Sequence, residues 1–480
     1  MILELVGARL FSPYLGAPLP VITAIIGVIL GCLAIGYWYG GAIADKRTDT
    51  GVFSFILAVA GISIGFITII ADPVLSAISV SAMPIALKAT LGTVILMGVP
   101  SVLLGMVSPY AVRLKLLNVE TSGKTVGRLY AISTVGSIVG TFMAGFYLIS
   151  AFGTTQIIVL LAVITALLAL LALNRRPTAI QYALAGIAIA VAISGAYAHN
   201  ALARERQIID IDTDYSRIMV DDQRVVINGR PVRTLFIGSV ANSGMFLDKD
   251  DDQPFEYAKY YRLATHFNPD IKQTLMLGGG GYSYPKEFIE RFPEATMDVV
   301  EIDPGVTAIA RQYFNLKDSP RMPIYHEDGR TFLNQTEKKY DAIYGDAFAS
   351  HYALPYQLAT KEAVQSMYDH LNEDGVLILN IGSAILGDLG KFLRAELRTF
   401  KEVFPQVYIF PVQQPGNPYA LQNVSLIALK TTAPADLIGT TPESKSFLSH
   451  RFTDEVPMDI PILTDNYAPV DQYTSPLAEY

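Results

Sequence analysis

The stretch Thr274-Leu-Met-Leu-Gly-Gly-Gly-Gly-Tyr-Ser-Tyr-Pro285 joins a short apolar run to four glycines and a proline. The apolar run predicts a buried strand, and the glycines allow the backbone to turn tightly and to approach a ligand closely. Pro285 suits the first turn of a helix. Strand, glycine turn and helix in this order are typical of nucleotide-binding folds, although Ser283 stands where the GxGxxG pattern has its last glycine.

Carboxylates follow each of the next three apolar runs. The run 297–303 ends in Glu301 and Asp303, which alternation along a strand places on one face, so either can accept hydrogen bonds from ribose hydroxyls. Capping of the next helix by Asp303 is compatible with ribose binding by Glu301. Asp328 follows the third run, where an acid can accept from an adenine amino group, and Asp346 ends the fourth.

The carboxyl ends of parallel strands meet at one edge of a sheet, where ligands bind. These acids therefore predict a nucleoside site. A dinucleotide oxidoreductase has no need of acids after the third and fourth strands, whereas a nucleoside–methionine ligand uses them for the ribose, the adenine and the reacting end. The predicted nucleoside-binding residues are Gly278, Gly279, Gly280, Gly281, Glu301, Asp303, Asp328 and Gly329, and Asp346 faces the crevice.

Apolar runs and helical patterns alternate from residue 273 to residue 429, which predicts a parallel, doubly wound α/β (Rossmann-like) sheet. Before it, short strands at 208–212, 217–220, 224–227 and 234–237 predict a small β subdomain, with an Asn228-Gly229 turn between the last two. The expected domains are a helical membrane domain at 1–200, the β subdomain with a helix at 201–270, and the nucleoside-binding domain at 271–480.

Composition separates the first domain from the rest of the 480-residue chain, which is 51% hydrophobic and 17% charged. Residues 1–200 contain ten Lys or Arg and five Asp or Glu, a net charge of +5; residues 201–480 contain 26 and 39, a net charge of −13. The first part is too poor in charge for a soluble domain. The acidic second part argues against a nucleic-acid partner, because such proteins need a basic footprint.

Six apolar segments are long enough to cross a bilayer, which predicts an all-α bundle and a multi-pass protein of the cell membrane with lipid as a partner. They lie at about 19–44, 52–71, 84–108, 127–150, 154–173 and 179–199. Glycine pairs at four-residue spacing favour close helix packing. Ionisable groups are almost absent from these segments, which disfavours a transport path. Assembly into a homo-oligomer is left open.

Two arguments about orientation oppose each other. The basic residues between segments fall on one side, and the positive-inside rule places that side in the cytoplasm. Six crossings then leave residue 200 outside the cell. The chemistry expected of the soluble part favours the cytoplasm instead.

Metal and disulfide chemistry have no support in the sequence. Cys32 is the one cysteine, so neither an intrachain disulfide nor a cysteine-based zinc site is expected. The histidines at 266, 326, 351 and 370 lack metal-ligand spacing, and no metal or prosthetic group is predicted.

The soluble part resembles the spermidine/spermine synthase (polyamine aminopropyltransferase) family over about residues 208–430, and the whole chain resembles its membrane-bound, fused branch. The matching motifs are Tyr215-Ser-Arg-Ile, the segment before Tyr257, Leu275-Met-Leu-Gly-Gly-Gly-Gly, Val299-Val-Glu-Ile-Asp, Asp328-Gly-Arg and Tyr340-Asp-Ala-Ile-Tyr-Gly-Asp. The resemblance implies transfer of an aminopropyl group from decarboxylated S-adenosylmethionine to an amine or polyamine, with release of 5′-methylthioadenosine.

The resemblance also implies roles for single residues. Glu301 holds ribose, Asp328 holds adenine, and Asp346 takes the catalytic-acid position near the amine. Tyr257 matches the pocket tyrosine, and Asn242 stands where a glutamine contacts the ligand. Further expected acceptor-site residues are Tyr344, His351 and Tyr352 around Asp346, and Asp465 in a tail that closes over the cleft.

The chain departs from the family pattern on the side that binds the cation. Gly281 replaces the Asp that contacts the donor's amine, Ala349 replaces a second Asp after Asp346, and the acceptor motif reads Tyr257-Ala-Lys. A long polycation needs several carboxylates, so these losses bear on the acceptor.

Three functions therefore stay open. The first is aminopropyl transfer by a spermidine synthase-like enzyme. The second is an enzyme that uses S-adenosylmethionine itself, either for transfer to another nucleophile or for intramolecular cleavage to methylthioadenosine. The third is a membrane sensor that binds a nucleoside without turnover.

Overall fold

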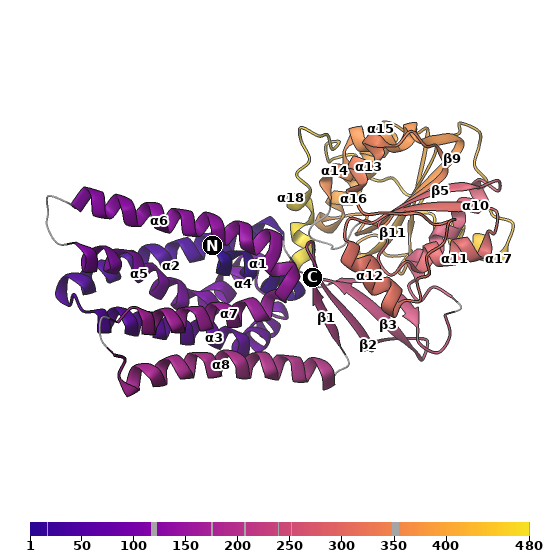
Figure 1. The fold of residues 1–480 in the computed structure, drawn as a ribbon. Helices are drawn as coiled ribbons and strands as arrows, with labels where there is room; N and C mark the ends of the chain where they lie inside the picture. Colours follow the sequence, from indigo (N-terminus) through magenta and orange to yellow (C-terminus); the bar gives the residue numbers. More distant parts are fainter. Residues whose placement is uncertain are drawn as a thin grey trace. The chain divides into compact units, whose positions relative to one another are not determined.

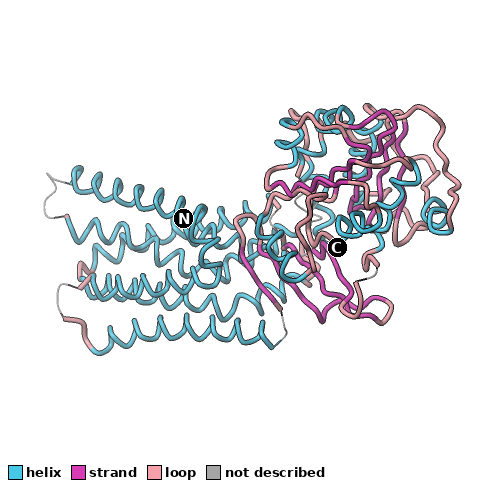
Figure 2. The backbone as a smooth tube through the Cα atoms, turned by 45° about the vertical axis from the view of Figure 1, so that its right-hand side comes forward, coloured by secondary structure: helices cyan, strands magenta, loops and turns pink. Residues whose placement is uncertain are grey.

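The computed structural model describes residues 1–16, 18–116, 122–173, 176–205, 208–238, 240–250, 252–347 and 355–479. The chain divides into two compact units, Met1–Arg217 and Ile218–Tyr480. Figures 1 and 2 show that the first unit is built almost wholly of helices and the second of strands and helices.

Among its described residues, the first unit contains six helices that are long and apolar enough to cross a membrane, as the sequence predicts. The shorter helix α1 precedes them, the π-helical turn η1 interrupts the third, and the π-helical turn η3 ends the fourth. The bounds are α1 Ile2–Leu15, α2 Leu19–Lys46, α3 Thr50–Ser79, α4 Ile85–Thr93, η1 Val94–Gly98, α5 Val99–Lys115, α6 Ser122–Met143, η3 Ala144–Leu148, α7 Ile149–Leu171 and α8 Ala179–Glu205.

Glycines let some of these helices touch backbone to backbone. A Cβ atom at Gly36 of α2 would clash with the carbonyl oxygen of Val102 in α5, and one at Gly65 of α3 would lie 3.1 Å from that of Ala188 in α8. Gly27 and Gly136 belong to the same spacing pattern, yet a Cβ there would meet no described atom within 4 Å. Glycine spacing thus marks α2–α5 and α3–α8 contacts but does not by itself identify a contact.

A four-stranded sheet has the order β1-β2-β3-β4, with β2/β3 and β3/β4 antiparallel. The predicted turn joins β2 to β3, and Asn228 and Gly229 both have positive φ there. The sequence predicted two strands between residues 217 and 227, but the structure has one, with an irregularity between Asp221 and Val225. The bounds are β1 Ile209–Asp212, β2 Arg217–Ile227, β3 Arg230–Ile237 and β4 Val240–Phe246.

The second, seven-stranded sheet has the order β10-β11-β9-β8-β5-β6-β7. It confirms the doubly wound α/β fold but corrects the expectation of a wholly parallel sheet, because β11 runs antiparallel to both neighbours. A strand buried on both faces reads the same in either direction, so its direction has no sequence signal. The bounds are β5 Gln273–Leu277, β6 Thr296–Val300, β7 Ile324–Tyr325, β8 Tyr340–Gly345, β9 Leu371–Ser383, β10 Gln406–Pro411 and β11 Gln422–Leu429.

Helices connect and follow these strands. They are α9 Glu256–Lys259, η4 Tyr260–Leu263, α10 Ala264–Phe267, α11 Ser283–Arg291, α12 Pro304–Tyr313, α13 Gly329–Gln335, α14 Tyr356–Ala359, α15 Lys361–Asp369, η5 Asp388–Gly390, α16 Lys391–Lys401, α17 Pro442–Ser449, α18 Val470–Thr474 and η6 Ser475–Glu479.

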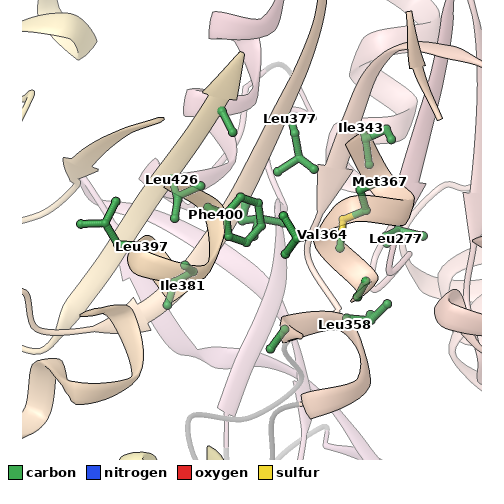
Figure 3. Close-up of a cluster of buried hydrophobic side chains, with 14 of the residues drawn as sticks. Leu277, Ile343, Leu358, Val364, Met367, Leu377, Ile381, Leu397, Phe400 and Leu426 are labelled. Atoms are coloured by element: carbon green, nitrogen blue, oxygen red, sulfur yellow. The ribbon is translucent and has the colours of Figure 1, made fainter. Parts of the chain in front are cut away.

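The main core lies between this sheet and the helices α15 and α16. Val364 and Met367 of α15 and Phe400 of α16 pack against the strands, as Figure 3 shows. Ile343 of β8 faces this core, and alternation turns its neighbour Tyr344 to the opposite face of the sheet. The core therefore fixes β5 and β8 side by side and aims the residues after them at a common edge.

Candidate functional site

The glycine turn after β5 touches the end of β8. The amide of Asp346 donates to the carbonyl of Leu277 at 2.8 Å, and a Cβ atom at Gly278 would lie 2.5 Å from the carbonyl oxygen of Asp346. Gly278 also has φ +98°, a conformation that residues with a Cβ avoid. Glycine at this position thus allows the turn and the acid to lie against each other.

Glu301, directly after β6, binds the glycine turn. Its Oε2 accepts from the amides of Gly279 at 2.9 Å and Gly280 at 3.2 Å, and its Oε1 accepts from the amide of Asp303 at 2.9 Å. Burial raises the pKa of Glu301, while the three amide donors oppose that rise. The carboxylate is therefore held in the turn that the sequence assigned to the nucleoside.

The two other predicted nucleoside-binding acids cap helices. Asp303 accepts from the amide of Gly305 at 2.8 Å at the start of α12. Asp328 accepts from the amide of Thr331 at 2.9 Å at the start of α13, directly before Gly329. The capping expected of Asp303 is present, and ligand contacts by these residues stay predictions.

Asp346 is half-buried at the same edge of the sheet. Asn380 at 3.2 Å and the Tyr257 hydroxyl at 3.3 Å donate to its two carboxylate oxygens. Burial raises the pKa of Asp346 to about 6, although these hydrogen bonds lower it. A carboxyl with such a pKa can exchange a proton near neutral pH.

A row of side-chain amides orients Asn380. Asn423 of β11 donates to the Asn380 side-chain oxygen at 2.9 Å, and Gln413 donates to the Asn423 side-chain oxygen at 2.8 Å. An amide whose oxygen is occupied in this way must point its NH2 group at Asp346. The antiparallel strand β11 therefore contributes to the site, which the sequence reasoning missed.

Tyr257 carries one hydroxyl proton and faces two acceptors. The carbonyl oxygen of Asn242 lies 2.5 Å from its hydroxyl oxygen, closer than Asp346. The side chain of Asn242 turns back to the carbonyl of Val240 in its own strand. Asn242 thus reaches the predicted site through its backbone.

Tyr261 is a site residue that the sequence reasoning treated as packing. Its buried hydroxyl has no hydrogen bond of good geometry within the described ranges, yet it lies close enough to Asp346 to lower the pKa of that carboxyl. Tyr257 and Tyr261 are four residues apart, which places both on one face of a helical segment. This spacing is the signal that could have identified Tyr261.

Tyr344, a predicted acceptor-site residue, lies in β8 two residues before Asp346, so the two side chains take the same face of the sheet. It is fully buried among aromatic rings, and the Tyr284 hydroxyl donates to its hydroxyl at 3.2 Å. Asp346, Tyr257 and Tyr261 line a cavity of about 20 Å³, whereas Tyr344 does not. Tyr344 therefore supports Tyr261 rather than facing that cavity.

Of the remaining predicted acceptor-site residues, Asp465 lies within the described part of the chain. Asp465 accepts from the Thr360 hydroxyl at 2.6 Å and from Arg330 at 3.1 Å, so it ties the tail to the start of α15. His351, Tyr352 and Ala349 lie outside the described residues. Within the described ranges, no group of three or more His, Cys, Asp or Glu side chains is arranged to hold a metal ion.

Gly281 lies where the family pattern has an acid. Its amide donates to the Ser243 hydroxyl at 2.9 Å. A Cβ atom at Gly281 would lie 2.9 Å from the Ser243 Cβ and 3.1 Å from the Phe314 ring, so an acidic side chain requires both neighbours to move. The packing of Ser243 and Phe314 around Gly281 therefore fits a glycine at this position and not the acid of the family pattern.

Residues 260–433, which include the glycine turn, Glu301, Asp328 and Asp346, match the family model of the spermine/spermidine synthase domain. The matched segment, called the synthase domain below, is similar to this family's domain and covers less than half of the chain. The synthase domain lies within the second unit, and the preceding helices are consistent with a fused branch of the family.

Curated relatives agree with this assignment. A polyamine aminopropyltransferase of Vibrio vulnificus is 34% identical over 34% of this chain and 54% of its own length. One of Streptococcus pneumoniae is 31% identical over 36% of this chain and 61% of its own length. The synthase domain thus matches little more than half of these relatives.

Among solved structures, a probable spermidine synthase from Corynebacterium glutamicum is similar to this chain. It shares 20% sequence identity at a TM-score of 0.44, over 50% of this chain and 86% of that structure.

Proposed function

We propose that the synthase domain transfers an aminopropyl group from decarboxylated S-adenosylmethionine to an amine and releases 5′-methylthioadenosine. The observation that carries the proposal is Asp346, a half-buried carboxyl beside the glycine turn, within hydrogen-bond distance of Asn380 and Tyr257 and with a pKa of about 6. In this proposal Glu301 binds the ribose and Asp328 the adenine. Tyr257 and Tyr261 lie beside the reacting amine.

In this reaction Asp346 acts as the proton acceptor. The amine nitrogen attacks the aminopropyl carbon attached to sulfur, a new C–N bond forms, and the C–S electron pair returns to the sulfur, which becomes a neutral thioether. The amine must be neutral to attack, and the product nitrogen loses a proton. Asp346 in its ionised form can accept that proton, either directly or through a water molecule.

We propose that the six apolar helices of the first unit span the cell membrane. Lys46 and Arg113 lie at span ends on the side that the positive-inside rule assigns to the cytoplasm, and the start of the synthase domain follows the opposite end of α8. A nucleoside donor made in the cytoplasm favours the reverse orientation, and we place the synthase domain in the cytoplasm on this chemistry.

A second candidate donor is S-adenosylmethionine itself. The packing around Gly281 favours it, since the acid expected to bind the donor's amine is absent and its space is filled by Ser243 and Phe314. The products would be S-adenosylhomocysteine after methyl transfer, or methylthioadenosine after cleavage or transfer of the larger group.

Product analysis tests these functions. The purified protein is incubated with either donor, with and without putrescine, and the products are identified by mass spectrometry. Aminopropyl transfer predicts methylthioadenosine and spermidine only when decarboxylated donor and putrescine are both present. Products from the ordinary donor alone support the second candidate. Nucleoside binding without any product contradicts both enzymes and supports a sensor.

Asn380→Leu is expected to move the acid limb of the kcat/KM pH profile upward by about 1 pH unit. A hydrogen bond to a charged group contributes roughly 1.5–3 kcal/mol, and the Asn380 bond lowers the pKa of Asp346. The loss of activity should therefore be larger at pH 6 than at pH 9. Asn372→Leu, at the opposite end of β9, is the matched control and should leave the profile unchanged. An equal loss at every pH would refute this role.

A further inference from the structure

A second cavity lies in the helical unit, within residues Met1–Arg217. Its volume is about 450 Å³, within the range of small-molecule pockets. The start of α7, the end of α8 and strand β1 line it. The polar groups used below are Gln156 on α7, Asn200 and Arg204 on α8, and Asp210 and Asp212 on β1.

One wall of this cavity is a hydrogen-bonded chain of ionisable side chains. His199 bonds to Asp72 of α3 at 2.8 Å and approaches Asp210 at 3.5 Å. Arg217 donates two hydrogen bonds to Asp210, at 2.8 and 2.6 Å. Tyr14 donates to the other oxygen of Asp72 at 2.6 Å. These groups are paired with one another, so they form a fixed wall and leave little capacity for a ligand.

Asp212 is different because one of its oxygens is unused. Its Oδ2 accepts from the amide of Thr154 at 2.6 Å, where Gly153 has φ +73° and a Cβ would lie 3.3 Å from that oxygen. Its Oδ1 is buried and has no hydrogen-bond partner among the described residues. A buried carboxylate oxygen without a donor is costly, so a donor from a bound molecule would stabilise it.

Arg204 supplies the opposite charge. Its exposed guanidinium lines the cavity and makes no hydrogen bond or ion pair with any described residue. The side-chain amides of Gln156 and Asn200 are likewise unpaired within the described ranges and can donate or accept. Within the described residues, the cavity thus offers one carboxylate oxygen without a donor and one guanidinium without a partner, and two side-chain amides also line it.

We propose that this cavity binds a zwitterion in which a short linker joins a primary ammonium to a phosphate or carboxylate. The ammonium donates to Asp212 Oδ1, and the anionic group binds Arg204. The ends of two apolar spans, Ala151 and Ala201, place the cavity at the depth of lipid headgroups. An ethanolamine phospholipid or a free zwitterion such as O-phosphoethanolamine carries this chemistry.

Lipid binding to the full-length protein tests the site. Phosphatidylethanolamine and phosphatidylcholine share the phosphate, but the choline nitrogen has no N–H to donate to Asp212. Native mass spectrometry titrations should show one phosphatidylethanolamine bound at least tenfold more tightly than phosphatidylcholine. Asp212→Asn should reduce this preference to threefold or less. Its amide oxygen can still accept from Thr154, which preserves the contact beside Gly153 in α7.

Arg204→Gln should weaken the binding of both lipids, because both carry the phosphate. Because Arg204 is exposed, this variant provides a test even if Asp212→Asn does not fold. Asp214→Asn, an exposed carboxylate two residues from Asp212, is the matched control and should change nothing. Displacement of the bound lipid by O-phosphoethanolamine supports the site and assigns a free zwitterion; a failure to displace it assigns the lipid. Equal wild-type affinity for the two lipids, or equal losses in Asp212→Asn and Asp214→Asn, would overturn the proposal.

Discussion

Asp346→Asn is expected to lower the rate of aminopropyl transfer by about a thousandfold and, at the same time, to make the folded synthase domain more stable. Loss of a positioned proton acceptor typically costs 10²–10⁴-fold in rate. The amide keeps an oxygen for Asn380 and gains an NH2 group that can donate to the Tyr257 hydroxyl, whose one proton can then go to the carbonyl oxygen of Asn242. The surrounding hydrogen bonds therefore survive the substitution while the proton acceptor is lost.

The gain in stability follows from the raised pKa. Burial raises the pKa of Asp346 from 3.8 to about 6 in the folded protein, so the folded state binds the proton more tightly than the unfolded chain. Wild-type stability should fall as the pH rises from about 4 to 6 and should stay lower above pH 6. The penalty on the ionised form corresponds to about 2–3 kcal/mol, which Asp346→Asn removes at neutral pH.

Calorimetric unfolding of the full-length protein at pH 5 and pH 8, alongside initial rates, measures both effects. The exposed Asp318 is the control, and Asp318→Asn should shift stability by less than about 0.5 kcal/mol. An Asp346→Asn protein that is inactive but less stable than wild type at pH 8 would show that Asp346 is structural. One that retains full activity would exclude Asp346 as the proton acceptor.

Glu301→Gln is expected to weaken nucleoside binding by at least about a hundredfold. Both carboxylate oxygens of Glu301 accept backbone N–H groups, one from Asp303 and the other from Gly279 and Gly280. Glutamine has a single acceptor oxygen, so its NH2 group must face an N–H group on one side. An unpaired buried donor costs about 1–3 kcal/mol, and the glycine turn loses its anchor in addition to the proposed ribose contact.

Asp303→Asn is the paired test, because both acids end the same strand and either was expected to bind ribose. Asn is as good a helix cap as Asp, so α12 should persist, and nucleoside affinity should change by less than about threefold if Glu301 is the ribose ligand. Isothermal titration with methylthioadenosine measures both variants. A hundredfold loss in Asp303→Asn with normal binding in Glu301→Gln would reverse the assignment.

The amino-acid sequence determined the features that depend on short-range patterns. Six apolar segments became six helices of spanning length, and alternating strands and helices became a doubly wound sheet. Gly278 and Asp346 were found because a turn and an acid at the ends of strands leave local signatures, and parallel strands bring those ends together.

Tertiary structure alone decided which groups surround those residues. Asn423 holds the Asn380 side chain toward Asp346 only because β11 runs antiparallel beside β9, and no local pattern specifies that direction. The pKa of Asp346 depends on burial, which distant segments produce together. Asp72 and His199, 127 residues apart, form a hydrogen bond that the hydropathy pattern does not predict. Sequence periodicity reports which face a side chain takes, whereas pairing and desolvation arise only when remote elements pack together.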